Sequence, residues 1–263
     1  MPIKLIALDM DGTLLNSQHQ LSPRNEGALR EAWARGVQIA FATGKTQHSA
    51  VPIIRKLGLT TPGVYVQGLV IANADGSVRY ERTLDSALAH EVAELATAAG
   101  CSMVAYAGRR LLTNVRDEYT DVFLKYHEPE TEAFGTWARV LETPVNKFIM
   151  VSTKARIDVL RPQVEAAVHG RATVVQALDY MLEVLPHGAS KGDGVRRLLA
   201  DLAIDPREML AVGDGENDVE MLQLAGVGVA MGNGMVAAKE AADYLTGTND
   251  EDGVAQAIER FVL

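Results

Sequence analysis

Ile3–Leu15 reads IKLIALDMDGTLL, an apolar run followed at once by two carboxylates and a glycine. The run Ile3–Leu8 is mostly aliphatic and does not alternate with polar residues, which predicts a strand buried on both faces. Asp9 and Asp11 stand two apart, so they share one side of the chain while it stays extended. Ligands in open α/β sheets bind beyond the carboxyl ends of the strands, so this stretch predicts an α/β fold with its chemistry there. Asp11-Gly12 alone would be equally typical of a surface turn, so the rest of the chain must decide.

Residues before about Leu84 and after about Pro186 repeat a pattern in which a strand is followed by a helix. Buried strands are predicted at Val37–Phe41, Met209–Val212 and Val227–Met231, and a helix follows each of them. A further strand is predicted at Val64–Val66, and Asp75-Gly76 predicts a hairpin after it. Ser22 and Ser190 precede helical stretches and have the side chain of a helix N-cap. Strands and helices that alternate with short links imply right-handed crossovers and a parallel sheet.

The pattern changes between about Leu84 and Pro186. Short strands and helices there predict an α+β unit, with a helix over Asp117–Tyr126 and a polar loop over Glu128–Gly135. We therefore expect a Rossmann-like parallel-sheet core with an inserted α+β cap domain. The predicted ranges are 1–84 for the first part of the core, 85–186 for the cap and 187–263 for the second part of the core.

Composition and charge exclude several classes of partner. The chain has 263 residues, 25 basic and 34 acidic, so its net charge of -9 opposes binding to nucleic acid or an anionic membrane. No apolar segment approaches the roughly 20 residues of a membrane span. We expect no signal peptide, because the apolar start runs straight into Asp9. Cys101 is the single cysteine, so no intrachain disulfide is possible, and the cytoplasm is the expected location.

Polar residues follow several of the predicted parallel strands. The carboxyl ends of parallel strands share one edge of the sheet, so residues far apart in sequence should converge there. The converging set consists of Asp9, Asp11, Thr43, Gly44, Asp214, Asn217 and Asp218, with Lys191 at the start of a nearby helix.

This set of side chains points to a metal-assisted reaction of phosphate. Clustered carboxylates repel one another unless a cation joins them, and oxygen ligands suit Mg²⁺, which also meets phosphate oxygens. A lysine and a threonine hydroxyl suit the remaining phosphate oxygens. The residues therefore predict phosphoryl transfer with an aspartate nucleophile and Mg²⁺.

Four motifs in this order carry a resemblance to a known family: DMDGTLL at Asp9–Leu15, ATGK at Ala42–Lys45, the lysine of SKGDGV at Lys191, and GDGENDVEML at Gly213–Leu222. The chain resembles the haloacid dehalogenase-like (HAD) phosphohydrolases, and the last motif resembles their Cof-type branch of sugar-phosphatase-like hydrolases. That branch carries an α+β cap between the second and third motifs, which matches the insertion expected here.

The resemblance implies a role for each matching residue. Asp9 would be the nucleophile that becomes aspartyl-phosphate, and Asp11 the general acid and then the base. The implied Mg²⁺ ligands are Asp9, the backbone carbonyl of Asp11, and Asp214. Asp218 would support these ligands without binding the metal itself. The implied holders of the phosphoryl oxygens are Thr43, Lys191, Asn217 and the backbone NH groups of Met10 and Gly44.

Two positions depart from the family pattern. Lys45 stands where the family usually has arginine, which puts a bidentate phosphate contact in doubt. Gln67-Gly68 stands where many relatives have Asn-Gly, which puts any ligand contact there in doubt but leaves the core chemistry intact.

The function expected from the sequence is a Mg²⁺-dependent phosphatase for small phosphate monoesters, such as sugar phosphates or related metabolites. A phosphomutase on the same scaffold is the first alternative, and it would need the cap to return phosphate to a reoriented sugar. A non-catalytic phosphate-binding module is the second, and the presence of both Asp9 and Asp11 disfavours it. A dehalogenase is disfavoured too, because Asp11 would have no leaving group to protonate.

Overall fold

The computed structural model describes residues 2–263, which form two compact units. One unit consists of residues 2–80 and Ser190–Leu263, and the other of Glu81–Ala189. The second unit is therefore an insertion in the first, and we call it the inserted domain. None of the helices in the described range combines the length and apolar character needed to cross a membrane.

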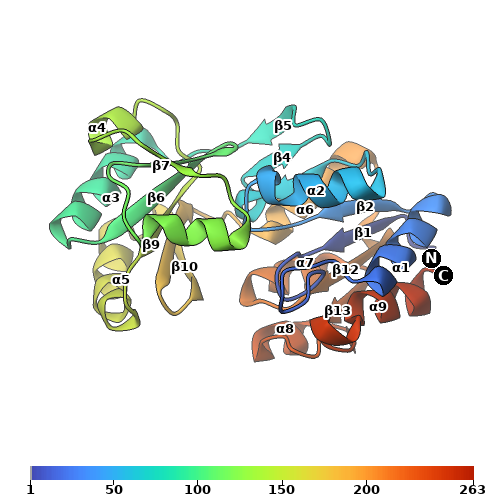
Figure 1. The fold of residues 1–263 in the computed structure, drawn as a ribbon. Coiled ribbons are helices and arrows are strands. Elements are labelled where there is room, and N and C mark those ends of the chain that lie inside the picture. The colour runs from blue at the N-terminus through green and yellow to red at the C-terminus, as the bar shows by residue number, and fades with distance from the viewer. Residues whose placement is uncertain (1) are drawn as a thin grey trace. The chain divides into compact units, whose positions relative to one another are not determined.

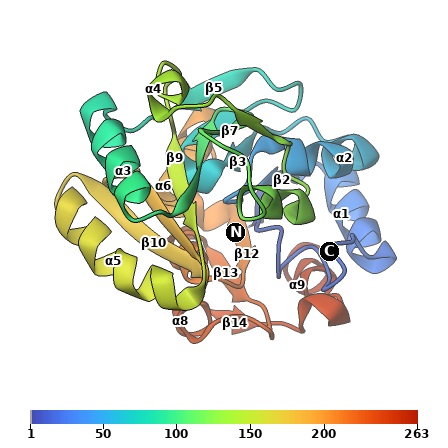
Figure 2. The ribbon, with the colours of Figure 1, turned by 60° about the vertical axis from the view of Figure 1, so that its left-hand side comes forward.

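The first unit is built on a parallel sheet with the strand order β14-β13-β12-β1-β2. Figure 1 labels β13, β12, β1 and β2, and Figure 2 labels β14. The strands are β1 (Leu5–Leu8), β2 (Gln38–Phe41), β12 (Met209–Gly213), β13 (Val227–Ala230) and β14 (Tyr244–Leu245). β1 lies between β12 and β2, with Leu8 paired to both Val212 and Phe41. All residues of β1 are buried, which confirms the strand predicted from its unbroken apolar run.

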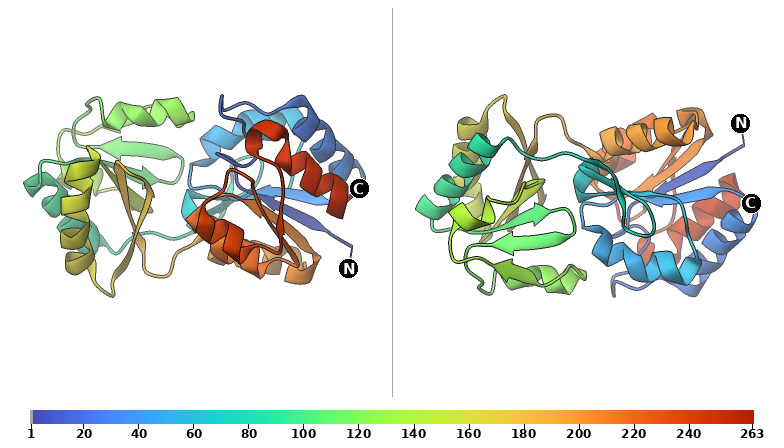
Figure 3. Two further views of the ribbon diagram at one scale, coloured as in Figure 1. Left: turned by 90° about the horizontal axis from the view of Figure 1, so that it is seen from below. Right: turned by 90° about the horizontal axis from the view of Figure 1, so that it is seen from above.

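Helices cover both faces of this sheet, which explains why its strands do not alternate in polarity. The helices are α1 (Pro23–Ala34), α2 (Gln47–Leu57), α6 (Lys191–Leu202), α7 (Val219–Leu224), α8 (Val236–Ala241) and α9 (Gly253–Phe261). Leu5 and Ala7 of β1 share one apolar cluster with residues of α6, α7 and α8. α1 and α9 contact β2 and β12 and also each other, side by side in Figure 3.

Two predicted N-caps begin their helices as expected. The Ser22 hydroxyl accepts a hydrogen bond of 3.1 Å from the backbone NH of Asn25 at the start of α1. Ser190 does the same at the start of α6, accepting from the NH of Asp193 at 3.1 Å. Each cap satisfies a backbone donor that the helix itself leaves without a partner.

A small antiparallel sheet of β3 (Gly63–Tyr65), β4 (Val70–Ala72) and β5 (Val78–Glu81) follows β2. It contains the hairpin predicted at Asp75-Gly76. The third strand was expected to run over Val64–Val66, but it ends at Tyr65. Val66 and Gln67 have φ angles of 52° and 58°, which are incompatible with an extended strand, and they open the short 3₁₀ turn η1 (Val66–Gly68).

The inserted domain contains a second sheet with the strand order β10-β11-β9-β6-β7-β8. Its strands are β6 (Ser102–Ala107), β7 (Arg110–Thr113), β8 (Thr131–Ala133), β9 (Lys147–Val151), β10 (Ala172–Leu178) and β11 (Met181–Pro186). The pairs are antiparallel except that β7 and β8 run parallel. The mixture of this sheet with helices confirms the predicted α+β class.

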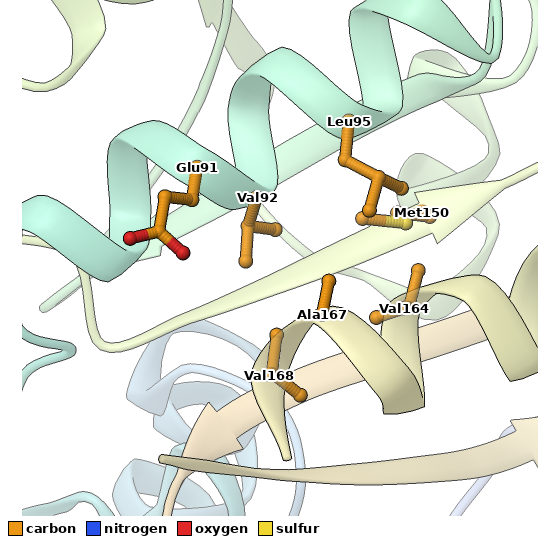
Figure 4. Close-up of a pocket in the computed structure, with 7 residues that line it drawn as sticks. All are labelled: Glu91, Val92, Leu95, Met150, Val164, Ala167 and Val168. Atoms are coloured by element: carbon orange, nitrogen blue, oxygen red, sulfur yellow. The ribbon is translucent and has the colours of Figure 1, made fainter.

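Helices α3 (Ser86–Ala98) and α5 (Lys154–Val168) contact each other and pack on the sheet of the inserted domain, as Figure 2 shows. Their apolar side chains form one cluster with alternate residues of the strands, among them Phe148 and Met150 of β9. An apolar pocket lies between the two helices, with Met150 at its floor and Glu91 at its edge (Figure 4). None of the predicted site residues lines this pocket.

The segment between β7 and β9 differs in detail from the prediction. The helix expected over Asp117–Tyr126 is a shorter 3₁₀ segment, η2 (Thr120–Tyr126). The stretch expected as a polar loop contains β8, and helix α4 (Trp137–Val140) follows it. β8 is only three residues long and two of them are exposed, so it left no apolar pattern in the sequence to detect.

Candidate active site

Asp9 stands directly after the buried strand β1. Its backbone NH donates to the carbonyl of Val212 at 3.1 Å, so the pairing of β1 with β12 continues one residue beyond the strand. The residue is buried, with 6% of its surface exposed. A carboxylate so placed needs compensating partners, because burial of an unpaired charge is strongly unfavourable.

Lys191 supplies the positive partner. It is the first residue of α6, and 1% of its surface is exposed. Its Nζ donates to Oδ1 of Asp9 at 2.6 Å and to Oδ1 of Asp218 at 2.8 Å. One ammonium therefore joins two carboxylates from opposite ends of the chain.

Asp218 is fully buried and already has partners on both oxygens. Its Oδ2 accepts hydrogen bonds from the backbone NH groups of Asp214 and Gly215, at 3.0 Å and 2.9 Å. Because its Oδ1 is bound to Lys191 and its Oδ2 to the backbone after β12, Asp218 stabilises this loop rather than offering a free oxygen to a metal. This geometry suits the supporting role that the sequence predicts for it.

Asp214 is held by residues of the loop after β1. The Thr13 hydroxyl donates to Oδ1 of Asp214 at 2.7 Å. Gly12 has φ of +76°, and a Cβ there would lie 2.4 Å from Oδ2 of Asp214. Glycine is therefore required at position 12 for both its backbone angle and its lack of a side chain.

Carboxylate oxygens of Asp9, Asp214 and Asp218 all lie within 4.8 Å of one another. Such a set of hard oxygen donors fits Mg²⁺, which binds proteins through few carboxylates and keeps several waters. Asp218 has its oxygens in other bonds, so Asp9 and Asp214 are the side chains better suited to hold the ion. The acidic cluster is thus consistent with the metal site expected from the sequence.

The charges of this cluster are unbalanced without a further cation. Burial raises the pKa of Asp9 well above its ordinary value, Lys191 opposes this effect, and Asp218 and Asp214 add to it. Burial likewise raises the pKa of Asp214, against the hydrogen bond from Thr13. Burial alone would lower the pKa of Lys191, but Asp218 and Asp9 raise it, so the ammonium stays charged. Three carboxylates against one ammonium favour binding of a divalent cation.

Asp11 has different partners from Asp9. Its Oδ1 accepts a hydrogen bond of 2.7 Å from Nζ of Lys45, and Nδ1 of His19 lies 3.4 Å from the same oxygen. The Asp11 side chain is 31% exposed, whereas that of Lys45 is 10% exposed. The two carboxylates predicted as catalytic are therefore held separately, Asp9 by Lys191 and Asp11 by Lys45.

The proposed phosphate-binding loop follows β2. Thr43 is buried, and its hydroxyl accepts a hydrogen bond of 3.2 Å from the backbone NH of Lys45. Gly44 lies against Gln67, since a Cβ at Gly44 would be 2.8 Å from Nε2 of that side chain. Oε1 of Gln67 accepts a hydrogen bond of 3.2 Å from Nδ2 of Asn217. Asn217 belongs to the 3₁₀ segment η4 (Glu216–Asp218).

The structure groups most of the predicted residues through direct contacts. Lys191, Asp9, Asp218 and Asp214 are joined in one cluster, and Asp11 is joined separately to Lys45. Met10 lies between the two aspartates with its side chain in the core.

Three residues that contact the predicted site residues were not predicted from the sequence: Thr13, His19 and Gln67. Thr13 was inside the decisive motif, and Gln67 was noted only as a departure from a pattern. His19 left no signal, because its approach to Asp11 depends on the path of the loop.

Known proteins resemble this chain over nearly its whole length. Residues 6–258 match the model of the haloacid dehalogenase-like hydrolases. A protein of Arabidopsis thaliana named chloroplastic endoribonuclease YBEY is 40% identical over 98% of this chain, but the match covers 46% of that protein. This chain thus spans about half of that relative. Phosphatase YwpJ of Bacillus subtilis is 30% identical, with 99% of this chain and 100% of that protein covered.

A solved structure extends the comparison to the fold. A haloacid dehalogenase-like hydrolase from Bacteroides thetaiotaomicron matches with a TM-score of 0.91 and 32% identity. The match covers 98% of this chain and 99% of that one, so it includes the inserted domain as well as the parallel sheet. The chain belongs to the haloacid dehalogenase-like hydrolases, in their Cof-type branch of phosphatases.

Proposed function

We propose that this hydrolase releases phosphate from small phosphate monoesters in the presence of Mg²⁺, through a phosphoryl group carried transiently by Asp9. The placement of Asp9 carries the proposal. Its carboxylate stands at the end of a central parallel strand, fixed by Lys191 at 2.6 Å, beside the oxygens of Asp214. A carboxylate held in this way is a preorganised nucleophile, and Lys191 together with a bound Mg²⁺ would offset the charge of a phosphoryl group.

The metal would be bound by the carboxylates of Asp9 and Asp214 and the backbone carbonyl of Asp11. Mg²⁺ bound there supplies positive charge that neutralises the phosphoryl oxygens. Lys191, Thr43 and Asn217 are the proposed side-chain donors to those oxygens, helped by the backbone NH groups of Met10 and Gly44. The Lys191 ammonium keeps its charge in the buried site, which this role requires.

Two chemical steps follow from this arrangement. In the first, an oxygen of Asp9 bonds to phosphorus, the bond from phosphorus to the ester oxygen breaks, and Asp11 gives a proton to that oxygen. In the second, a water oxygen bonds to phosphorus, the bond to Asp9 breaks, and Asp11 takes the proton of the water. Lys45 engages Oδ1 of Asp11, which leaves Oδ2 for the proton in both steps.

We propose a small phosphorylated metabolite as the substrate. The net charge of -9 disfavours a nucleic acid. A relative supports the class: YcsE of Bacillus subtilis, 30% identical over 99% of this chain and 96% of that protein, is named 5-amino-6-(5-phospho-D-ribitylamino)uracil phosphatase. The cytoplasm remains the proposed location, since the single Cys101 requires no oxidising compartment.

Hydrolysis of an aryl phosphate tests the proposal. Protein stripped of metal with EDTA should be inactive on p-nitrophenyl phosphate and should regain activity with Mg²⁺. The Asp9→Asn variant, purified in parallel, controls for contaminating phosphatase. Binding of phosphate without turnover of any ester would support the phosphate-binding module instead. Isomerisation of a sugar phosphate without release of inorganic phosphate would support the phosphomutase.

A screen over phosphorylated metabolites then ranks substrates by kcat/KM. Sugar phosphates and phosphorylated nucleobase precursors should be hydrolysed faster than phosphopeptides or phosphorylated nucleic acid ends. The opposite ranking would contradict the proposed substrate class while leaving the phosphatase chemistry intact.

A further inference from the structure

We propose that Gln67 is a positioning residue for phosphate binding: its side-chain amide holds Asn217 in the arrangement that binds the phosphoryl oxygens. This inference rests on the proposed function, which gives Asn217 and Gly44 their roles. Neither the family pattern nor the motifs assign a role to Gln67. The role is inferred instead from the contacts of the Gln67 backbone and side chain.

The backbone around Gln67 adopts an unusual conformation. Val66, Gln67 and Gly68 have consecutive positive φ angles of 52°, 58° and 89°. Positive φ is ordinary for glycine but unfavourable for a β-branched residue such as valine. Such a conformation persists only where the surroundings fix it, and backbone strain of this kind gathers at functional sites.

The surroundings fix this turn from two sides. The backbone NH of Val66 donates to the carbonyl of Lys45 at 2.9 Å, and that of Gln67 donates to the carbonyl of Thr43 at 3.2 Å. On the other side, a Cβ at Gly68 would lie 2.1 Å from the carbonyl oxygen of Ser190, the N-cap of α6. The turn is therefore pressed between the loop that follows β2 and the helix that begins with Lys191.

The side chain of Gln67 completes the link. It is buried, with 5% of its surface exposed. Its Oε1 accepts the hydrogen bond from Asn217, while its Nε2 side lies against Gly44, where an added Cβ would come within 2.8 Å of Nε2. One amide thus connects two segments that are both proposed to contact phosphate. With one hydrogen of the Asn217 amide engaged by Gln67, the other is left for a phosphoryl oxygen.

A position filled only for packing would behave differently from a positioning residue. If Gln67 merely fills space, an apolar side chain of similar length should keep substrate binding. If Gln67 acts through Asn217, loss of its amide should weaken phosphate binding, and that effect should vanish once Asn217 has lost its own amide. The two readings therefore differ in a double-mutant cycle, which isolates the interaction between two residues.

The cycle consists of Gln67→Met, Asn217→Ala and the double variant, measured against the unaltered enzyme. The readouts are KM and kcat for p-nitrophenyl phosphate and the inhibition constant of inorganic phosphate. Gln67→Met should raise KM and the phosphate inhibition constant roughly 3- to 10-fold, the size expected for one hydrogen bond, with a smaller change in kcat. In the Asn217→Ala background the same substitution should change either constant by less than about 2-fold.

Gln47→Met is the matched control. Gln47 is an equally buried glutamine, and its Nε2 donates to the carbonyl of Asn73 rather than to a site residue. This variant should leave KM and phosphate inhibition unchanged. If Gln67→Met does not fold, Gln67→Ala replaces it in the cycle with the same expected changes, because alanine also lacks the amide.

The outcomes separate the inference from the function on which it rests. An unaltered enzyme without phosphatase activity would contradict the proposed function. An active enzyme in which Gln67→Met leaves both constants unchanged, or in which the two substitutions act independently, overturns the role of Gln67 alone. Asn217→Ala with unaltered constants overturns it as well, because Gln67 would then have nothing to position.

Discussion

The ammonium of Lys191 donates a hydrogen bond of 2.6 Å to Oδ1 of Asp9, although the two residues are 182 positions apart in the chain. Both are buried, and the same ammonium reaches Asp218 at 2.8 Å. The bond joins the first strand of the sheet to a helix that begins after the inserted domain. Folding of the parallel sheet and assembly of the proposed nucleophile therefore depend on each other.

Lys191→Met should destabilise the metal-free protein and abolish turnover. Removing one partner of a buried ion pair leaves an uncompensated charge and costs about 3–5 kcal/mol in the free energy of unfolding. Because the pKa of Asp9 is raised by burial, a lower pH protonates the carboxylate and should reduce this loss. Urea unfolding at about pH 5.5 and about pH 8 measures the difference. An equal loss of stability at both pH values would argue against the pairing.

Mg²⁺ should stabilise the protein more at about pH 8 than at about pH 5.5. Asp9 and Asp214 have raised pKa values, chiefly through burial, so the folded metal-free protein holds protons there that the unfolded chain has released. Their contribution to stability therefore falls as pH rises above the ordinary aspartate value through the raised one. A metal that replaces those protons binds better at high pH.

Thermal unfolding with EDTA and with Mg²⁺ at both pH values measures this linkage. Asp214→Asn is the control, and it should remove most of the metal-dependent rise in Tm. A rise in Tm that does not depend on pH, or that survives in Asp214→Asn, would place the metal elsewhere.

Asp11→Asn should lower kcat by roughly 10²- to 10⁴-fold, the usual range for a general acid-base group. The loss should be smaller for p-nitrophenyl phosphate than for an alkyl phosphate, because a good leaving group needs less protonation. Steady-state kinetics on the two substrates supply the comparison. Equal losses on both would indicate that Asp11 acts only through its ion pair with Lys45.

The first unit should fold and keep aryl-phosphate turnover when residues 83–186 are replaced by a short linker. Its apolar cluster is separate from that of the inserted domain. Nη2 of Arg82 donates to the carbonyl of His187 at 2.7 Å, so the two connecting segments come close enough to be joined. The shortened protein should lose its discrimination among sugar phosphates, if the inserted domain acts as a cap that contacts the substrate.

Substrate ranking by kcat/KM, with and without the inserted domain, measures this loss. The circular dichroism spectrum and Tm of the shortened protein show whether it is folded. A folded protein with the same order of preference for sugar phosphates would contradict the role of residues 85–186 as a specificity-determining cap.

The sequence predicted the parts of the structure that depend on local pattern. The unbroken apolar run of Leu5–Leu8, the caps Ser22 and Ser190, and the polar loop after β12 all leave signals within a few residues. The α/β class, the inserted α+β domain and the family follow from these signals. The proposed chemistry could be predicted from the sequence for the same reason, because each motif lies next to a predicted strand or helix end.

What escaped prediction depends on contacts between distant segments. Gln67 meets Asn217 150 positions later, and Thr13 meets Asp214 201 positions later. The polarity of either residue does not reveal its partner. Val66 continues an apolar strand pattern, yet its backbone has a positive φ where its NH donates to the carbonyl of Lys45. For this reason the strand predicted from the sequence ended at Val66, one residue beyond the end of β3.

The most direct test of the central claim is identification of the phosphorylated residue. The Asp11→Asn variant should hydrolyse the intermediate slowly, so rapid acid quenching after mixing with p-nitrophenyl phosphate and Mg²⁺ should trap it. Peptide mapping by mass spectrometry should then find phosphate on the peptide that contains Asp9, and Asp9→Asn/Asp11→Asn should show none. Turnover by the unaltered enzyme with no covalent phosphate trapped in Asp11→Asn, or with phosphate on another residue, would contradict the proposed nucleophile.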